Sequence, residues 1–114
     1  MHYFDHEKLD CYQVAVQALV LVDEIARSLP RGYGNLKDQM QRASQSTVLL
    51  IAEASARTGA DRACRFRQSR AEAGEVACAL EVAGKLRVAN AAKCSEAREL
   101  LLRVSAMLWP LTKS

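Results

Sequence analysis

The segment from Leu36 to Arg57 limits the possible folds of this chain more than any other. Its apolar residues recur at spacings of three and four, the period that places side chains on one face of an α-helix. Thr47 falls on the same face. The pattern therefore predicts an amphipathic helix that packs in a helical bundle. The apolar positions are Leu36, Met40, Ala43, Leu50, Ile51 and Ala54.

Three further segments have comparable patterns, and the scarcity of glycine (5) and proline (2) favours helices over a turn-rich β fold. Pro30 ends the first helix, because the residue before a proline is pushed out of the α region. The connections are short, so neighbouring helices run antiparallel. The sequence thus predicts one all-α domain over residues 1–114, an up-down-up-down four-helix bundle. The expected helices are about 5–29, 35–57, 61–88 and 95–109, with caps at Asp5, Asn35, Thr58 or Asp61, and Ser95.

The third predicted helix has two apolar stripes on nearly opposite faces. One stripe, which runs from Phe66 to Gly84 and is interrupted by Ser69, is expected to face the core. The second stripe needs another partner, and a copy of the same chain is the natural candidate. We therefore predict a homo-oligomer. Its expected interface residues are Cys64, Ala71, Cys78, Val82 and Leu86, together with Leu49 on the second helix.

Five arginines stand at the end of the second predicted helix and just after it, and only one acid, Asp61, interrupts them. Four of them fall at the start of the third predicted helix. Cations in the first turn of a helix oppose its macrodipole, so this placement is unfavourable for the third helix itself. Three interpretations stay open at this point: the arginines bind phosphate, they pair with acids of a neighbouring subunit, or they are simply solvated. The expected nucleic-acid-binding residues are Arg57, Arg62, Arg65, Arg67 and Arg70.

Other candidate sites have simpler structural interpretations. Glu53 precedes Arg57 by four residues, the favourable order for an ion pair on a helix, and no second acid or metal partner suggests a catalytic role. His2 and His6 have the spacing of two metal ligands, but no third ligand is evident. The four cysteines form no CxxC pair, so we expect thiols that pack as small apolar groups. We expect no catalysis, metal or cofactor.

One set of positions carries a resemblance to a known family: Phe4, Leu9, Tyr12, Ala15, Leu29-Pro30, Tyr33-Gly34-Asn35-Leu36, Gln39, Arg42, Ala43, Ser46, Ile51-Ala52-Glu53, Arg57 and Arg70 to Glu75. At these positions the chain resembles the bacterial four-helix-bundle proteins first noticed in intervening sequences of 23S ribosomal RNA genes. Leu50, Ala54, Ala56 and Ala71-Glu72 depart from that family's pattern of Asn, glycines and Gly-Ser. The resemblance implies a bundle that often forms rings, pentamers among them. It also implies kinship with the accessory protein of a reverse transcriptase in diversity-generating retroelements, which contacts nucleic acid.

These patterns together predict a non-catalytic oligomer, most simply a ring. The N-terminus lacks the features of a signal peptide, and the most apolar run, Val14 to Val22, is too short to span a bilayer. We therefore expect a cytoplasmic protein without membrane contact. RNA or DNA, or an enzyme that acts on nucleic acid, is the expected partner of the arginines. The alternative is a protein–protein adaptor that uses exposed apolar residues such as Val48 and Leu49.

Overall fold

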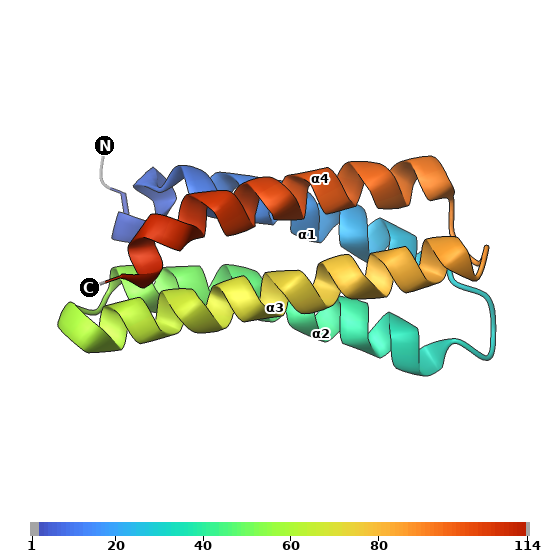
Figure 1. The fold of residues 1–114 in the computed structure, drawn as a ribbon, viewed down its shortest axis with the longest axis horizontal. Helices are drawn as coiled ribbons and strands as arrows, with labels where there is room; N and C mark the ends of the chain where they lie inside the picture. Colours follow the sequence, from blue (N-terminus) through green and yellow to red (C-terminus); the bar gives the residue numbers. More distant parts are fainter. Residues whose placement is uncertain (1–2, 114) are drawn as a thin grey trace.

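The computed structural model describes residues 3–113, which form helices and no strands. Four long α-helices are preceded and followed by short 3-10 turns. All four run along the long axis of a molecule that measures 43 × 30 × 20 Å (Figure 1). The elements are η1 (Asp5–Lys8), α1 (Asp10–Ser28), α2 (Gly34–Ser55), α3 (Gly59–Lys85), α4 (Ala91–Leu108) and η2 (Trp109–Thr112).

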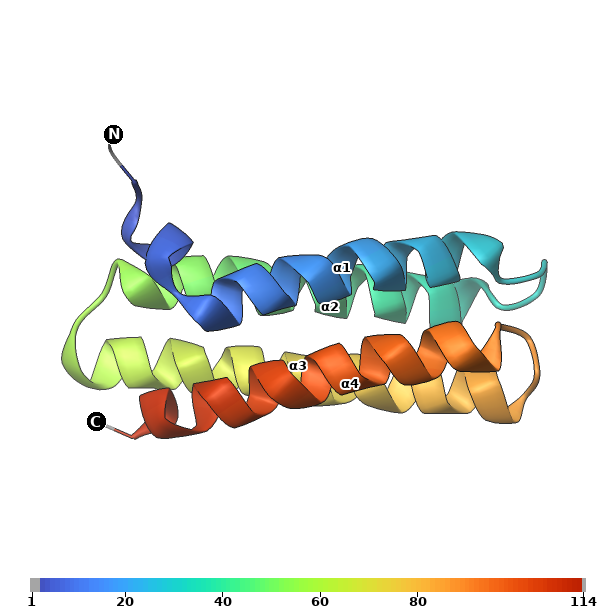
Figure 2. The ribbon, with the colours of Figure 1, turned by 90° about the horizontal axis from the view of Figure 1, so that it is seen from above.

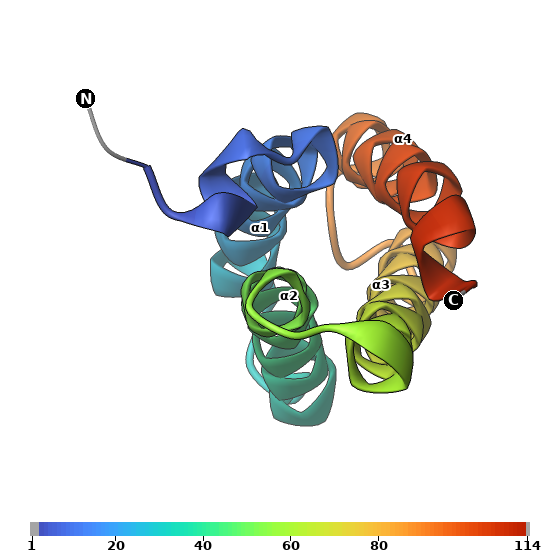
Figure 3. The same cartoon turned by 90° about the vertical axis from the view of Figure 1, so that its left-hand side faces the viewer.

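Each connection reverses the direction of the chain, as an up-down-up-down topology requires (Figure 2). Viewed from one end, the helices stand at the corners of a square in chain order (Figure 3). Each helix packs against its neighbours in sequence, and α1 packs against α4 to close the bundle. The predicted all-α fold with four helices is therefore confirmed. The turn between α2 and α3 lies at the same end as both chain termini.

The core is built largely from alanine and branched aliphatic residues, with Phe66 as its largest fully buried side chain. Small side chains allow the helices to approach closely, and the larger ones fill the space between them. On α2 the predicted face is buried at Met40, Ala43, Thr47, Ile51 and Ala54, whereas Leu36 and Leu50 are half-buried at its edges.

Ser69 does not interrupt the core stripe of α3, because it is fully buried and makes a specific contact. Its Oγ donates a hydrogen bond to the backbone oxygen of Thr47 at 2.8 Å. The Thr47 hydroxyl in turn donates to the Ala43 oxygen at 2.8 Å. A buried hydroxyl is costly only when it lacks a partner, so these polar groups can join α2 to α3 inside the core.

The first helix begins later than the sequence pattern indicates. Asp5 belongs to the separate turn η1, and Leu9 is extended (φ −88°, ψ 127°) before α1 starts at Asp10. Glu7 holds this turn by accepting a hydrogen bond from the Phe4 amide at 3.2 Å. The extended Leu9 packs against the core, which supplies a reason for the break.

The expected cap of the fourth helix was also wrong. The structure starts α4 at Ala91, and the Asn90 side chain accepts a hydrogen bond from the Lys93 amide at 2.9 Å. Ser95 lies inside the helix. Asparagine is among the strongest N-cap residues, and the two alanines that follow it are the best helix formers, so the helix begins earlier.

The remaining ends differ from expectation by a few residues. α2 begins at Gly34, and α3 begins at Gly59 with Thr58 in the N-cap position but without a side-chain cap bond. α3 ends at Lys85, shortly before Arg87, whose positive φ of 59° is incompatible with a continuing helix. Pro110 falls in the turn η2, where α4 has already ended.

Candidate nucleic-acid interface

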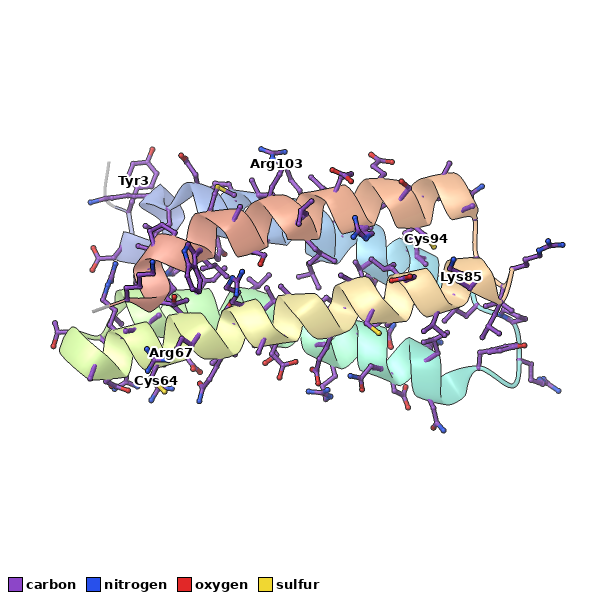
Figure 4. The ribbon with its side chains drawn as sticks, in the orientation of Figure 1. Tyr3, Cys64, Arg67, Lys85, Cys94 and Arg103 are labelled. Atoms are coloured by element: carbon purple, nitrogen blue, oxygen red, sulfur yellow. The ribbon has the colours of Figure 1, made fainter. Side chains whose placement is uncertain are left out.

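The five arginines lie at the end of the bundle where α2 turns into α3. The first half of α3 runs beside the last turns of α4 and beside η2. Arg67 and Cys64 can be seen on this half of α3, near the C-terminus (Figure 4). The basic segment therefore lies beside the last turns of α4 and beside η2. The spacing of residues in the sequence did not predict this contact.

Two of the arginines are paired with acids. Arg65 contacts Glu53 on α2 at 3.2 Å and Asp61 on its own helix at 3.3 Å. Arg57 lies 4.0 Å from Asp61. Within residues 3–113 the expected pair of Glu53 with Arg57 is thus replaced by Glu53 with Arg65. Arg57 lies beyond the end of α2, so the helical i, i+4 geometry assumed for that pair does not extend to it.

Two other arginines bind carbonyl groups at the end of the chain. Arg67 donates from Nη1 to the Thr112 oxygen at 2.9 Å, and Arg70 donates from Nε to the Ser105 oxygen at 3.1 Å. Ser105 lies in the last turn of α4, where a helix carries its negative pole, and its oxygen also accepts from the Trp109 amide. Because α3 begins at Gly59, Arg67 and Arg70 lie beyond its first turn. Arg70 stabilises the C-terminal end of α4, and Arg67 stabilises η2.

Aromatic rings contact two of these guanidinium groups. The Arg62 guanidinium lies 4.9 Å from the centre of the Phe66 ring, and that of Arg70 lies 4.9 Å from the centre of the Trp109 ring. Carbonyls and rings orient a cation without neutralising it. Among residues 3–113, Arg62, Arg67 and Arg70 have no carboxylate within ion-pair distance, so their charges remain uncompensated.

Trp109 is the residue of this end that sequence reasoning missed. It is half exposed, and Lys113 places its ammonium 4.4 Å from the ring centre. A hollow of about 270 Å³ beside it is lined by Arg67, Arg70, Ala71, Trp109 and Thr112. The sequence signal was the chain's single tryptophan, followed directly by Pro110 and four residues later by Lys113. This signal is weak without the knowledge that α3 lies beside it.

The second stripe of α3 is largely exposed in the single chain. Ala71, Cys78, Val82 and Leu86 are exposed, and Cys64 is half-buried. Leu49 on α2 is also exposed, at 60%. Val48, expected to be exposed beside it, is instead a core residue at 7%, because it turns toward the interior of the bundle.

The middle of the bundle carries acids instead. Arg42 lies 3.6 Å from both Glu72 and Glu75. Burial raises the pKa of Glu72 above its usual value, the neighbouring Glu75 adds to this rise, and Arg42 opposes it. The uncompensated arginines are therefore confined to one end of α3, and the acids of the same helix follow further along.

The four cysteines and His6 lie in the part of the chain that the structure describes, where they do not form a shared ligand set. Cys11 and Cys94 are buried, and burial raises the pKa of both thiols, which keeps them protonated. His6 stacks on Phe4 and contacts Tyr12 edge-on, while His2 lies outside the described residues. Within residues 3–113, no three metal-ligating side chains come together. No helix in that range is long and apolar enough to cross a membrane.

The fold and its surface define a small antiparallel four-helix bundle with an arginine-rich end and an uncovered apolar stripe on α3. Residues 7–109 match the family model described as 23S rRNA-intervening sequence protein. The match spans nearly the whole chain, and the protein belongs to that family, as its resemblance predicted. No curated protein matches the sequence.

Proposed function

We propose that this protein is a non-catalytic, self-associating bundle that binds RNA or DNA through the basic end formed by Arg57, Arg62, Arg65, Arg67 and Arg70. The observation that carries the proposal is the uncompensated charge of Arg62, Arg67 and Arg70. Each guanidinium has five N–H donors, and the carbonyl bonds of Arg67 and Arg70 use one donor each. The remaining donors are available to phosphate oxygens, which arginine binds in a bidentate manner.

Self-association is part of this proposal, because it would place several basic ends in one assembly. The exposed stripe of Ala71, Cys78, Val82 and Leu86 is an apolar surface that a second copy can cover. We favour a closed ring, in which several basic ends bind one nucleic acid and gain affinity through effective concentration. The family description names ribosomal RNA, which makes structured RNA the first partner to test.

A non-catalytic role agrees with the position of Glu53. This carboxylate is exposed and ion-paired with Arg65, a typical arrangement for a structural charge at a helix end. A general acid or base is instead usually placed in a cleft where its pKa is tuned. We therefore assign binding, and no reaction, to this end of the bundle.

The test neutralises two arginines that have no carboxylate partner among the described residues 3–113. The variant Arg62→Gln/Arg67→Gln is compared with a control, Arg31→Gln/Lys85→Gln, which removes the same charge at the opposite end of the bundle. We expect only the first variant to lose affinity for RNA. The fall of log affinity with log salt should also become less steep in this variant, by about 1.5 in slope, because each lost phosphate contact contributes about 0.7–0.9. Equal losses in both variants would refute the site.

A protein–protein adaptor is the second candidate, and the exposed side chains of Leu49, Val82 and Leu86 favour it. An enzyme that processes nucleic acid is one such partner. Pull-down after nuclease treatment separates the two functions. Partners that survive nuclease and depend on Leu49 support the adaptor, whereas partners lost with the nucleic acid support direct binding.

A further inference from the structure

Trp109 is held in an exposed position by its neighbours in the chain. Leu108 before it is fully buried, and Thr112 after it is 6% exposed. The Thr112 hydroxyl donates to the Trp109 oxygen at 2.7 Å, while Arg67 binds the Thr112 oxygen. The turn is thus anchored on both sides, whereas the indole between the anchors is half exposed.

Cations and an apolar hollow surround the exposed indole. The guanidinium of Arg70 and the ammonium of Lys113 lie 4.9 and 4.4 Å from the ring centre. The adjacent hollow of about 270 Å³ brings Arg67 and Arg70 beside the ring. An aromatic face next to basic groups is the arrangement with which proteins bind single-stranded nucleic acid, where bases stack and phosphates pair with cations.

The two cations differ in how firmly they are held. Arg70 is fixed by its bond to the Ser105 oxygen. Lys113 is exposed, and among residues 3–113 its ammonium contacts the indole and has no carboxylate within ion-pair distance. A lysine on a flexible four-carbon stem can leave the ring and contact a phosphate while a base takes its place.

Building on the proposed function, we propose that Trp109 stacks an unpaired base of a single-stranded nucleic acid, with Arg67, Arg70 and Lys113 binding the adjacent phosphates. A base inside a duplex cannot reach the indole, because its faces are already stacked. The site therefore favours single strands, loops and ends over continuous duplex. The contact is tolerant of sequence, since every base presents a π-face.

The first experiment measures affinity for labelled oligothymidine, for an abasic strand of the same length and for a DNA duplex. We expect Trp109→Ala to weaken oligothymidine binding by about 5- to 150-fold, Trp109→Phe to weaken it less, and duplex binding to stay unchanged. The unaltered protein should prefer oligothymidine over the abasic strand, which keeps every phosphate. Equal affinity for these two strands would overturn the stacking proposal and leave phosphate binding intact. Absence of binding to all three would overturn both.

The second experiment uses the unaltered chain, whose single tryptophan makes its fluorescence specific for this site. We expect saturating oligothymidine to quench the emission of Trp109, and the abasic strand to quench it far less. An emission unchanged at saturation would contradict stacking even if the substituted proteins fail to fold.

Discussion

Arg70 on α3 donates a hydrogen bond from Nε to the backbone oxygen of Ser105 on α4, at 3.1 Å. This contact gives Arg70 a structural role in the first half of α3, which begins at Gly59. The two helices are antiparallel, so the start of α3 lies beside the end of α4, where carbonyls carry partial negative charge. The charge of Arg70 is therefore favourable where the two helices meet.

Removing the Arg70 side chain should therefore destabilise the bundle. We expect Arg70→Ala to lower the free energy of unfolding by about 1–2 kcal/mol, because a charged hydrogen bond to a half-buried carbonyl is lost. Arg103, which points away from the bundle on α4 (Figure 4), is the control. Its alanine variant should stay within about 0.5 kcal/mol of the parent protein in urea unfolding. Equal effects of the two substitutions would contradict the role of the Ser105 contact.

The start of α4 can be tested by comparing the observed cap with the expected one. Asn90→Ala removes the bond to the Lys93 amide and should cost about 1 kcal/mol of unfolding free energy. Ser95→Ala, inside the helix, should cost little or be neutral, since alanine is the best helix former. Chemical denaturation of both variants measures the difference, and a larger loss from Ser95→Ala would place the cap there instead.

The apolar stripe of α3 should control assembly rather than folding. We expect Val82→Glu to shift the mass measured by light scattering toward the monomer, because a charge cannot be buried in an apolar subunit contact without a partner. Val20→Glu introduces the same charge at an exposed position on α1, at 65% exposure, and should leave the mass unchanged. Helicity should be retained in both. An intact oligomer in the Val82 variant would remove this stripe from the interface.

Stability should depend on pH through Glu72. Its pKa lies above the ordinary value of 4.5, chiefly because burial disfavours the charged carboxylate. Between pH 4.5 and this raised pKa, the folded chain binds more protons than the unfolded chain. The free energy of unfolding therefore falls as pH rises through this range. We expect Glu72→Gln to raise the neutral-pH urea midpoint relative to the parent protein, with the gain vanishing well below pH 4.5. A gain from Glu72→Gln that persists in acid would contradict this assignment.

The fold was predictable because helical periodicity is a local property of the sequence. Met40, Ala43 and Ile51 recur on one face, and Pro30 stops a helix without reference to anything distant. The ends were less predictable, since Asn90 and Ser95 are both good caps, and the two alanines after Asn90 favour the earlier start only by a small local preference. The break at Leu9 depends on packing against the core, which is a tertiary effect.

The candidate site was predictable only in part. The arginines are close together in the sequence, so their cluster can be recognised without a structure. Their partners are not, because Thr112 follows Arg67 by 45 residues and becomes its neighbour only when the bundle closes. Trp109 was missed for the same reason. The prediction for Val48 was wrong because its angular position lies at the edge of the buried face, where periodicity discriminates poorly.

The most direct test of nucleic-acid binding is the affinity of the unaltered protein for structured RNA and for single-stranded RNA across a salt series. The mass of the assembly should be measured on the same sample. We predict binding to both at low salt, with log affinity falling linearly and steeply with log salt as phosphate contacts are lost. Absence of binding at low salt by a folded, intact assembly would contradict the account and make the adaptor the leading function.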